Sequence, residues 1–200
     1  MTRPFLISTA ILFALTIGMS VFVSELHHRE AARPRTRPAT ALERIAPPSA
    51  GPVEKATVFV AYDDPGELRA QSISVPVASA RQQRAEALLG ALVGIYTAKD
   101  SPHPLAAGAD IRGVFLVDPG LAVIDLNSAL VDGQVSGVLS EELTIASMIQ
   151  TLSANLPGLS RVKFLVDGKQ RDTLAGHADL AGFYDVSQVA RLAAQLSAPE

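Results

Sequence analysis

Apolar positions form one long uninterrupted run near the start of the chain, followed by shorter runs with strand-like or helix-like spacing. The long run, Phe5 to Val23, contains nineteen residues without a charge. At about 1.5 Å per residue it can cross a hydrocarbon layer roughly 30 Å thick. Signal peptides usually have a shorter apolar region of about 7–15 residues before a small-residue cleavage site. The pattern therefore predicts an uncleaved transmembrane helix within residues 1–28, with a signal peptide as the alternative.

Strand-like segments begin after a linker, residues 29–52, whose prolines and arginines predict an extended spacer. Ala56 to Tyr62 is rich in β-branched and aromatic residues and is followed by the turn residues Asp63-Asp64-Pro65-Gly66. Leu68 to Val77 alternates more weakly, and Pro76 restricts it to a sheet edge or a strand terminus. Both segments are predicted to be β-strands.

Helical spacing and turn residues predict the remaining elements. An amphipathic helix is expected at residues 81–94, where Ala85, Leu88, Leu89 and Leu92 share a face, and a β-hairpin at 112–127 around Asp118-Pro119-Gly120. The expected elements that follow are a long helix ending near Asn155, a strand at 161–166, an Asp167-Gly168 turn, a short strand at 170–174 and a last helix at 187–196.

This order of elements predicts a single α+β sandwich-like domain, with helices on one face of a mixed or mostly antiparallel sheet and a transmembrane helix in front. The domain boundaries are placed at residues 1–28 for the anchor, 29–52 for the linker, 53–186 for the domain and 187–200 for a helical tail. Homo-oligomerisation through the edge at Ser72 to Val77 or the stripe at Ala85 to Leu92 is one further expectation.

Charge and cysteine content exclude some classes of function. Residues 1–52 hold six Lys and Arg against three Asp and Glu, whereas residues 53–200 hold eleven against seventeen. An acidic domain lacks the basic stripe that neutralises phosphates, so nucleic acid is not an expected partner. The chain has no cysteine, which excludes disulfides and a lipid-modified cysteine.

Polar residues on the long helix admit two interpretations. At about 100° per residue one face is polar, with Ser140, Thr144, Ser147 and Thr151. In the first interpretation Ser140 is the N-cap and Glu141 and Glu142 lie in the first turn, where the helix dipole stabilises carboxylates by about 0.3–1 kcal/mol. In the second, Glu141 is partly buried and lines a ligand groove or a subunit contact.

Other candidate residues point to structure more than to catalysis. Asp125 lies inside an apolar strand, where a buried hydrogen-bond acceptor that fixes a loop is the simpler interpretation. His177 lies in AGHADL close to Asp179 and could form a metal pair with His103, but zinc sites usually have three or four ligands and no such set is evident. We therefore expect no metal and no cofactor.

Catalytic motifs are absent from the sequence: there is no GxSxG, P-loop, GxGxxG, HExxH or cysteine nucleophile. The sequence therefore predicts that the protein is not an enzyme. The alternative is a hydrolase of envelope polymer such as peptidoglycan, using a pair of Asp or Glu residues such as Glu141 with Asp125. Such a hydrolase would need two carboxylates about 5–10 Å apart in an open cleft.

Several motifs together resemble the GerMN domain, a module of bacterial sporulation, spore germination and envelope proteins. The resemblance covers about Thr57 to Leu180. It is carried by VFV at 58–60, AVIDLN at 122–127, SEE at 140–142, Thr151-Leu152, the DGK turn at 167–169 and DTLAGHADL at 172–180. It places Glu141 on the glutamate of the family.

The resemblance implies a non-catalytic, membrane-tethered, extracytoplasmic module that binds a cell-wall component such as peptidoglycan or an envelope protein partner. The candidate binding residues are Glu141, Asp125, Thr151 and His177. Arg29, Arg33, Arg35 and Arg37 follow the apolar run, and the excess of positive charge on the cytoplasmic side of membrane proteins would place the domain in the cytoplasm. We give more weight to the resemblance, which implies a single-pass protein of the cytoplasmic membrane with a periplasmic domain.

Overall fold

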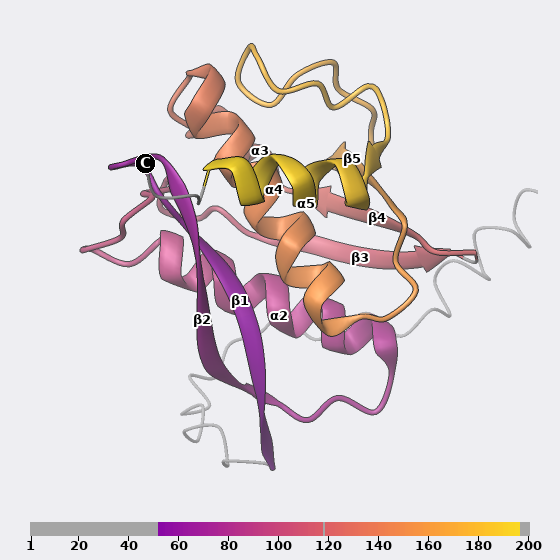
Figure 1. Cartoon of the computed structure of the whole chain (residues 1–200). Helices are drawn as coiled ribbons and strands as arrows, with labels where there is room; N and C mark the ends of the chain where they lie inside the picture. Colours follow the sequence, from indigo (N-terminus) through magenta and orange to yellow (C-terminus); the bar gives the residue numbers. More distant parts are fainter. Residues whose placement is uncertain (1–51, 118, 197–200) are drawn as a thin grey trace, which may run out of the picture. The chain divides into compact units, whose positions relative to one another are not determined.

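The computed structural model describes residues 52–117 and 119–196 (Figure 1). The expected anchor at 1–28 and nearly all of the linker at 29–52 lie outside these residues. No helix among the described residues is long and apolar enough to cross a membrane. The elements are β1 (Val53–Tyr62), β2 (Glu67–Pro76), α2 (Arg81–Tyr96), β3 (Ile111–Val117), β4 (Leu121–Leu126), α3 (Ser128–Asp132), α4 (Val138–Asn155), β5 (Arg161–Val166), β6 (Tyr184–Asp185) and α5 (Val186–Leu196).

The strands form two sheets where one sheet was expected. Strands β1 and β2 make an antiparallel pair with Val53 opposite Pro76, so the proline stands at a strand end as predicted. The second sheet has the order β3-β4-β5-β6 and is mixed: β4 and β5 are parallel, and the two outer pairs are antiparallel. The α+β class with mixed strands is therefore confirmed, and the division into two sheets is the correction.

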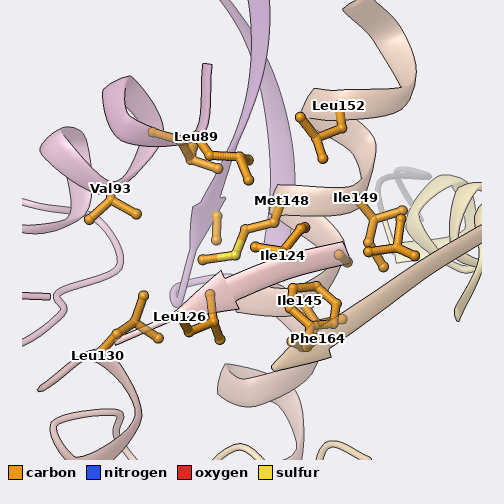
Figure 2. Packing of buried hydrophobic residues seen from close by; sticks show 14 of the residues in the cluster. Leu89, Val93, Ile124, Leu126, Leu130, Ile145, Met148, Ile149, Leu152 and Phe164 are labelled. Atoms are coloured by element: carbon orange, nitrogen blue, oxygen red, sulfur yellow. The ribbon is translucent and has the colours of Figure 1, made fainter. Parts of the chain in front are cut away.

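Helix α4 belongs to the crossover between the parallel neighbours β4 and β5, because parallel strands cannot be joined by a tight turn. Its apolar face packs on the side of the sheet that carries Ile124 and Phe164, and α2 contributes Leu89 to the same core (Figure 2). The largest fully buried side chains in the described residues include Tyr96, Phe164, Leu88, Leu89, Leu92, Ile124, Leu126, Leu130, Leu143, Met148, Ile149 and Leu152.

The predicted apolar stripe of α2 is entirely inside the protein. Ala85, Leu88, Leu89 and Leu92 each have no exposed surface. The helix itself is confirmed, but the expectation that this stripe meets a second copy of the chain is wrong, since the stripe is occupied by the core. The edge of β2 near Ser72 stays a prediction for such a contact.

The strand expected at Gln170–Leu174 is absent. After β5 the chain makes a tight turn in which Asp167 and Gly168 have positive φ values of 50° and 73°, and Val166 and Lys169 form an isolated bridge. The following residues form a loop. Leu174 is fully buried and anchors this loop. A buried apolar residue is also typical of a strand, which explains the wrong prediction.

The C-terminal helix α5 packs on the domain. Asp185 Oδ1 accepts hydrogen bonds from the N–H groups of Ser187 and Gln188, which is the geometry of an N-cap. The side chains of Val189 and Ala193 are buried in the main core cluster. The predicted helix is therefore present and forms one wall of the domain.

Candidate functional site

The first turn of α4 is built differently from the sequence prediction. Its N-cap is Gly137, and no side chain caps the helix from that position. Ser140 lies inside the helix, where its Oγ accepts a hydrogen bond from Gln134 Nε2 at 3.1 Å. The proposed N-cap role of Ser140 is therefore wrong: the helix begins earlier, and Glu141 Oε1 reaches back to the Gly137 N–H at 3.2 Å.

Glu141 is a fully buried carboxylate that holds a distant loop. Its Oε2 accepts hydrogen bonds from the N–H groups of Ala175, His177 and Ala178, each at 2.9 Å. Its Oε1 accepts a further bond from His177 Nδ1 at 2.9 Å, so the Nδ1 atom carries the proton.

The charge of Glu141 is stabilised by these bonds. Burial raises the pKa of the carboxyl, but the hydrogen bonds from His177 and the loop amides outweigh it and lower the pKa to about 2. Because all of its surface is covered, Glu141 cannot touch a ligand directly. It positions His177, whose side chain is 43% exposed.

Lys163 of β5 fixes the next part of the same loop. This side chain is 9% exposed, and its Nζ donates to the carbonyl oxygens of Leu180 and Ala181 at 2.6 Å each. The side chain of Leu180 is fully buried beneath the loop. The loop is therefore attached to α4 at one end and to β5 at the other, which preorganises the residues between them.

A groove of about 310 Å³ lies between α4, this loop and α5. Residues on the inner sides of the two helices provide an apolar floor, and four polar side chains form the rim. The floor contains Ile145, Ala146, Val189 and Leu192, and the rim contains Glu142, His177, Asp179 and Tyr184, with Ala178 completing the lining. We call this the α4–α5 groove.

The rim of the α4–α5 groove is negatively charged. Burial, together with the nearby carboxylates of Asp179, Glu142 and Glu141, raises the pKa of Tyr184 to about 12. Tyr184 therefore keeps its proton at neutral pH. Because Nδ1 of His177 donates to Glu141, its Nε2 is the ring nitrogen left for a ligand.

Thr151, a candidate from sequence, lies elsewhere and completes the free edge of β1. Its Oγ1 accepts from the Phe59 N–H at 2.9 Å, and the amide of Asn155 bonds both the N–H and the carbonyl of Thr57. Tyr96 OH accepts from the Ala61 N–H at 2.8 Å. The backbone N–H groups of these three alternate β1 residues face away from β2. Polar side chains therefore bond them where a neighbouring strand would otherwise pair, and the sheet ends there.

Asp125 also lies outside the groove. Its Oδ1 accepts from the Gly168 N–H at 2.8 Å, and its Oδ2 accepts from Arg112 Nε at 3.3 Å. Arg112 also contacts Asp167. The carboxylate therefore holds the DGK turn, which agrees with the loop-fixing interpretation.

The two histidines considered as a metal pair have separate partners. His103 is 1% exposed and bonds Asp63 through Nδ1 at 2.6 Å and Thr144 through Nε2 at 2.7 Å. His177 bonds Glu141. Within residues 52–117 and 119–196 no group of three or more His, Cys, Asp or Glu side chains could hold a metal ion.

The structure thus brings His177 to the groove and Glu141 beneath it, and places Asp125 and Thr151 at structural contacts. Sequence reasoning missed Asp179, Tyr184 and Leu192 as lining residues. The amphipathic spacing of the last helix was a signal that it packs, but its partner surface on α4 cannot be inferred from spacing alone.

Comparisons with known proteins identify the family. A family model described as "Germane: Sporulation and spore germination" matches residues 57–172. No curated protein sequence matches significantly.

Among solved structures, the tandem GerMN domains of the sporulation protein GerM from Bacillus subtilis are 16% identical with a TM-score of 0.50, over 64% of this chain and 44% of that one. The first GerMN domain of the same protein is 12% identical with a TM-score of 0.46, over 64% and 94% of the two chains. A putative lipoprotein from Clostridium perfringens is 15% identical with a TM-score of 0.44, over 74% and 96%.

The tandem-domain match shows a shared fold, and this chain spans less than half of that protein fragment. The family match spans most of the folded region and confirms the resemblance drawn from the hairpin, the long helix and the DGK turn. Because the family model matches more than half of the 200 residues, the chain belongs to the Germane family of sporulation and spore germination.

Proposed function

We propose that this protein is a non-catalytic, membrane-tethered module whose domain binds a cell-wall component, such as a peptidoglycan fragment, in the α4–α5 groove. The observation that carries the proposal is the groove itself. Its volume of about 310 Å³ lies within the range of small-ligand sites, and an apolar floor with a few polar groups is their usual composition. An envelope protein partner is the second candidate.

The environment of Glu141 and Asp125 does not suit this pair to hydrolysis. Glu141 has no exposed surface and accepts five hydrogen bonds, so it cannot exchange protons with a substrate. Asp125 is held by Arg112 and the Gly168 N–H, and neither carboxylate lines the groove. The pair therefore lacks the open cleft that a glycoside hydrolase of this type needs.

The expected anchor and the family support a domain on the outer side of the cytoplasmic membrane. This location is tested with Lys99→Cys, which adds one exposed cysteine to a cysteine-free chain. We expect a membrane-impermeant thiol reagent to label it in intact spheroplasts. Labelling only after lysis would place the domain in the cytoplasm and contradict the proposal.

Binding is tested by retention of the full-length chain on purified peptidoglycan sacculi. Leu192→Arg places a long cation in the groove, at a side chain that is 42% exposed, and we expect it to reduce retention at least fivefold. Val117→Arg is the matched control because Val117 is 48% exposed and lies outside the groove lining. Equal retention of both variants would contradict binding at the groove. Failure of the unmodified chain to bind sacculi would leave the envelope protein as the candidate.

A further inference from the structure

We propose that the α4–α5 groove selects an aliphatic chain that ends in a primary amine, as in a lysine or other diamino acid side chain of a peptide. This inference rests on the proposed function, because it names the chemical group that the same groove would take. It is carried by three features of the groove: the apolar floor, the two carboxylates on its rim, and the fixed loop that bears one of them, Asp179.

The floor suits an unbranched hydrocarbon stem. Ile145 and Ala146 of α4 face Val189 and Leu192 of α5 across the groove. Ile145 and Ala146 are nearly buried, whereas Leu192 keeps 42% of its surface exposed at the groove mouth. A stem of several methylene groups laid on this floor would remove apolar surface from water, which contributes about 0.8 kcal/mol per fully buried CH₂ in small-molecule transfer.

Two carboxylates give the rim its negative charge. Glu142 and Asp179 line the groove together with Tyr184, and no Lys or Arg is among the lining residues. Within the described residues the side-chain carboxylate of Glu142 takes part in no hydrogen bond or ion pair. Asp179 uses one oxygen to accept from the Ala181 N–H at 2.7 Å, which leaves its other oxygen for a ligand.

The Tyr184 hydroxyl lies in the electrostatic field of the same carboxylates. Burial and three carboxylates, those of Asp179, Glu142 and Glu141, raise its pKa to about 12. The same carboxylates would attract an ammonium group and repel a carboxylate or phosphate. An ammonium has three donors, and the rim supplies the acceptors Glu142, Asp179 and the Tyr184 hydroxyl.

The loop that bears Asp179 is held before any ligand arrives. Glu141 fixes the backbone of residues 175, 177 and 178, and Lys163 fixes the carbonyls of residues 180 and 181. Asp179 lies between these two attachments. A ligand therefore does not have to order the loop, which reduces the entropic cost of binding.

The test uses the full-length chain in detergent micelles, labelled with ¹³C at isoleucine and leucine methyl groups. It is titrated at neutral pH with Nα-acetyl-lysine methylamide, and NMR shifts are followed at Ile145 and Leu192. The norleucine analogue, which has the aliphatic stem without the amine, is the matched ligand. We expect the lysine probe to bind about tenfold more tightly than the norleucine probe.

Variants identify the carboxylate responsible. Glu142→Gln should weaken the lysine probe about three- to tenfold and leave the norleucine probe unchanged. Asp100→Asn removes the same charge from an exposed loop residue outside the groove lining and should change neither affinity.

Each adverse result has a distinct meaning. Equal affinity for the two probes would overturn the amine selectivity and leave the groove as a binding site. If neither probe shifts the groove methyl groups while Leu192→Arg still loses retention on sacculi, the amine inference fails and the proposed function stands. If neither probe binds and Leu192→Arg is retained like Val117→Arg, both fail.

Discussion

At the scale of single residues, Glu141 shows how a conspicuous polar side chain can shape a site without touching its ligand. Its carboxylate accepts hydrogen bonds from a helix N-terminus, three loop N–H groups and an imidazole. Removing one partner of such a buried charged network costs more than the net contribution of the network, because the other groups stay buried without partners.

Glu141→Gln should therefore destabilise the protein by about 2–4 kcal/mol. The amide nitrogen of glutamine cannot accept hydrogen bonds, so part of the loop loses its acceptor. Urea denaturation measures the loss, and Glu142→Gln, at the exposed neighbouring position, should change stability by less than about 0.5 kcal/mol. Equal stabilities for the two variants would mean that the loop does not depend on the buried carboxylate.

The pH dependence of stability follows from the same residue. The folded-state pKa of Glu141 is about 2, below its ordinary value of 4.5, so its contribution is fully present above pH 4.5 and is lost as pH falls towards 2. The loss is on the order of 3 kcal/mol. Denaturation of the unmodified chain between pH 5 and 2 should show this decrease. Glu141→Gln should show a smaller decrease over the same range, and parallel curves would contradict the assignment.

At the scale of elements, polar side chains at the C-terminal end of α4 occupy the edge of a sheet. Thr151 and Asn155 are one helical turn apart, and Thr57 and Phe59 are two residues apart on the strand. The two helix side chains can therefore accept hydrogen bonds from the N–H groups of alternate strand residues. The sequence predicted the helix and its polar face correctly because both depend on local spacing. It could not show that this face meets β1, whose Phe59 lies 92 residues from Thr151 along the chain.

Thr151→Val should destabilise the protein by about 1–3 kcal/mol, because the Phe59 N–H loses its acceptor and stays shielded from water. Thr57→Val makes the same chemical change at an exposed side chain of β1 and should be within about 0.5 kcal/mol of the unmodified chain. Hydrogen exchange of the Phe59 amide should accelerate in Thr151→Val alone. Unchanged exchange would show that this bond does not protect the edge.

The cap of α5 links helix formation to the groove, since α5 supplies Val189 and Leu192. Asp185→Ala removes the acceptor of the Ser187 and Gln188 N–H groups and should increase amide exchange through the first turn of α5. Asp185→Asn keeps a capping side chain and should exchange more slowly than the alanine variant. If both variants exchange alike, the cap does not stabilise the helix.

At the scale of the whole molecule, the domain boundary predicted after residue 186 would separate α5 from the domain, although α5 packs into its core. Truncation after Asp185 would uncover the contacts of Val189 and Ala193 and should lower the free energy of unfolding by about 2–4 kcal/mol. Urea denaturation of the truncated and intact chains measures this difference. Equal stability of the truncated and intact chains would mean that α5 does not stabilise the domain and is an independent tail.

Local sequence determined most of the elements, their order and the family, because side-chain spacing, turn residues and motifs act over a few neighbouring positions. The same local reasoning failed for Ser140, whose capping role depended on where the helix begins, and for residues 170–174, whose buried leucine anchors a loop. The tertiary structure alone decided that Thr151 ends a sheet, that Glu141 holds a loop 34 to 37 residues away and that α5 closes the groove. The physical reason is that hydrogen bonds and cavities join residues that are close in space and distant along the chain.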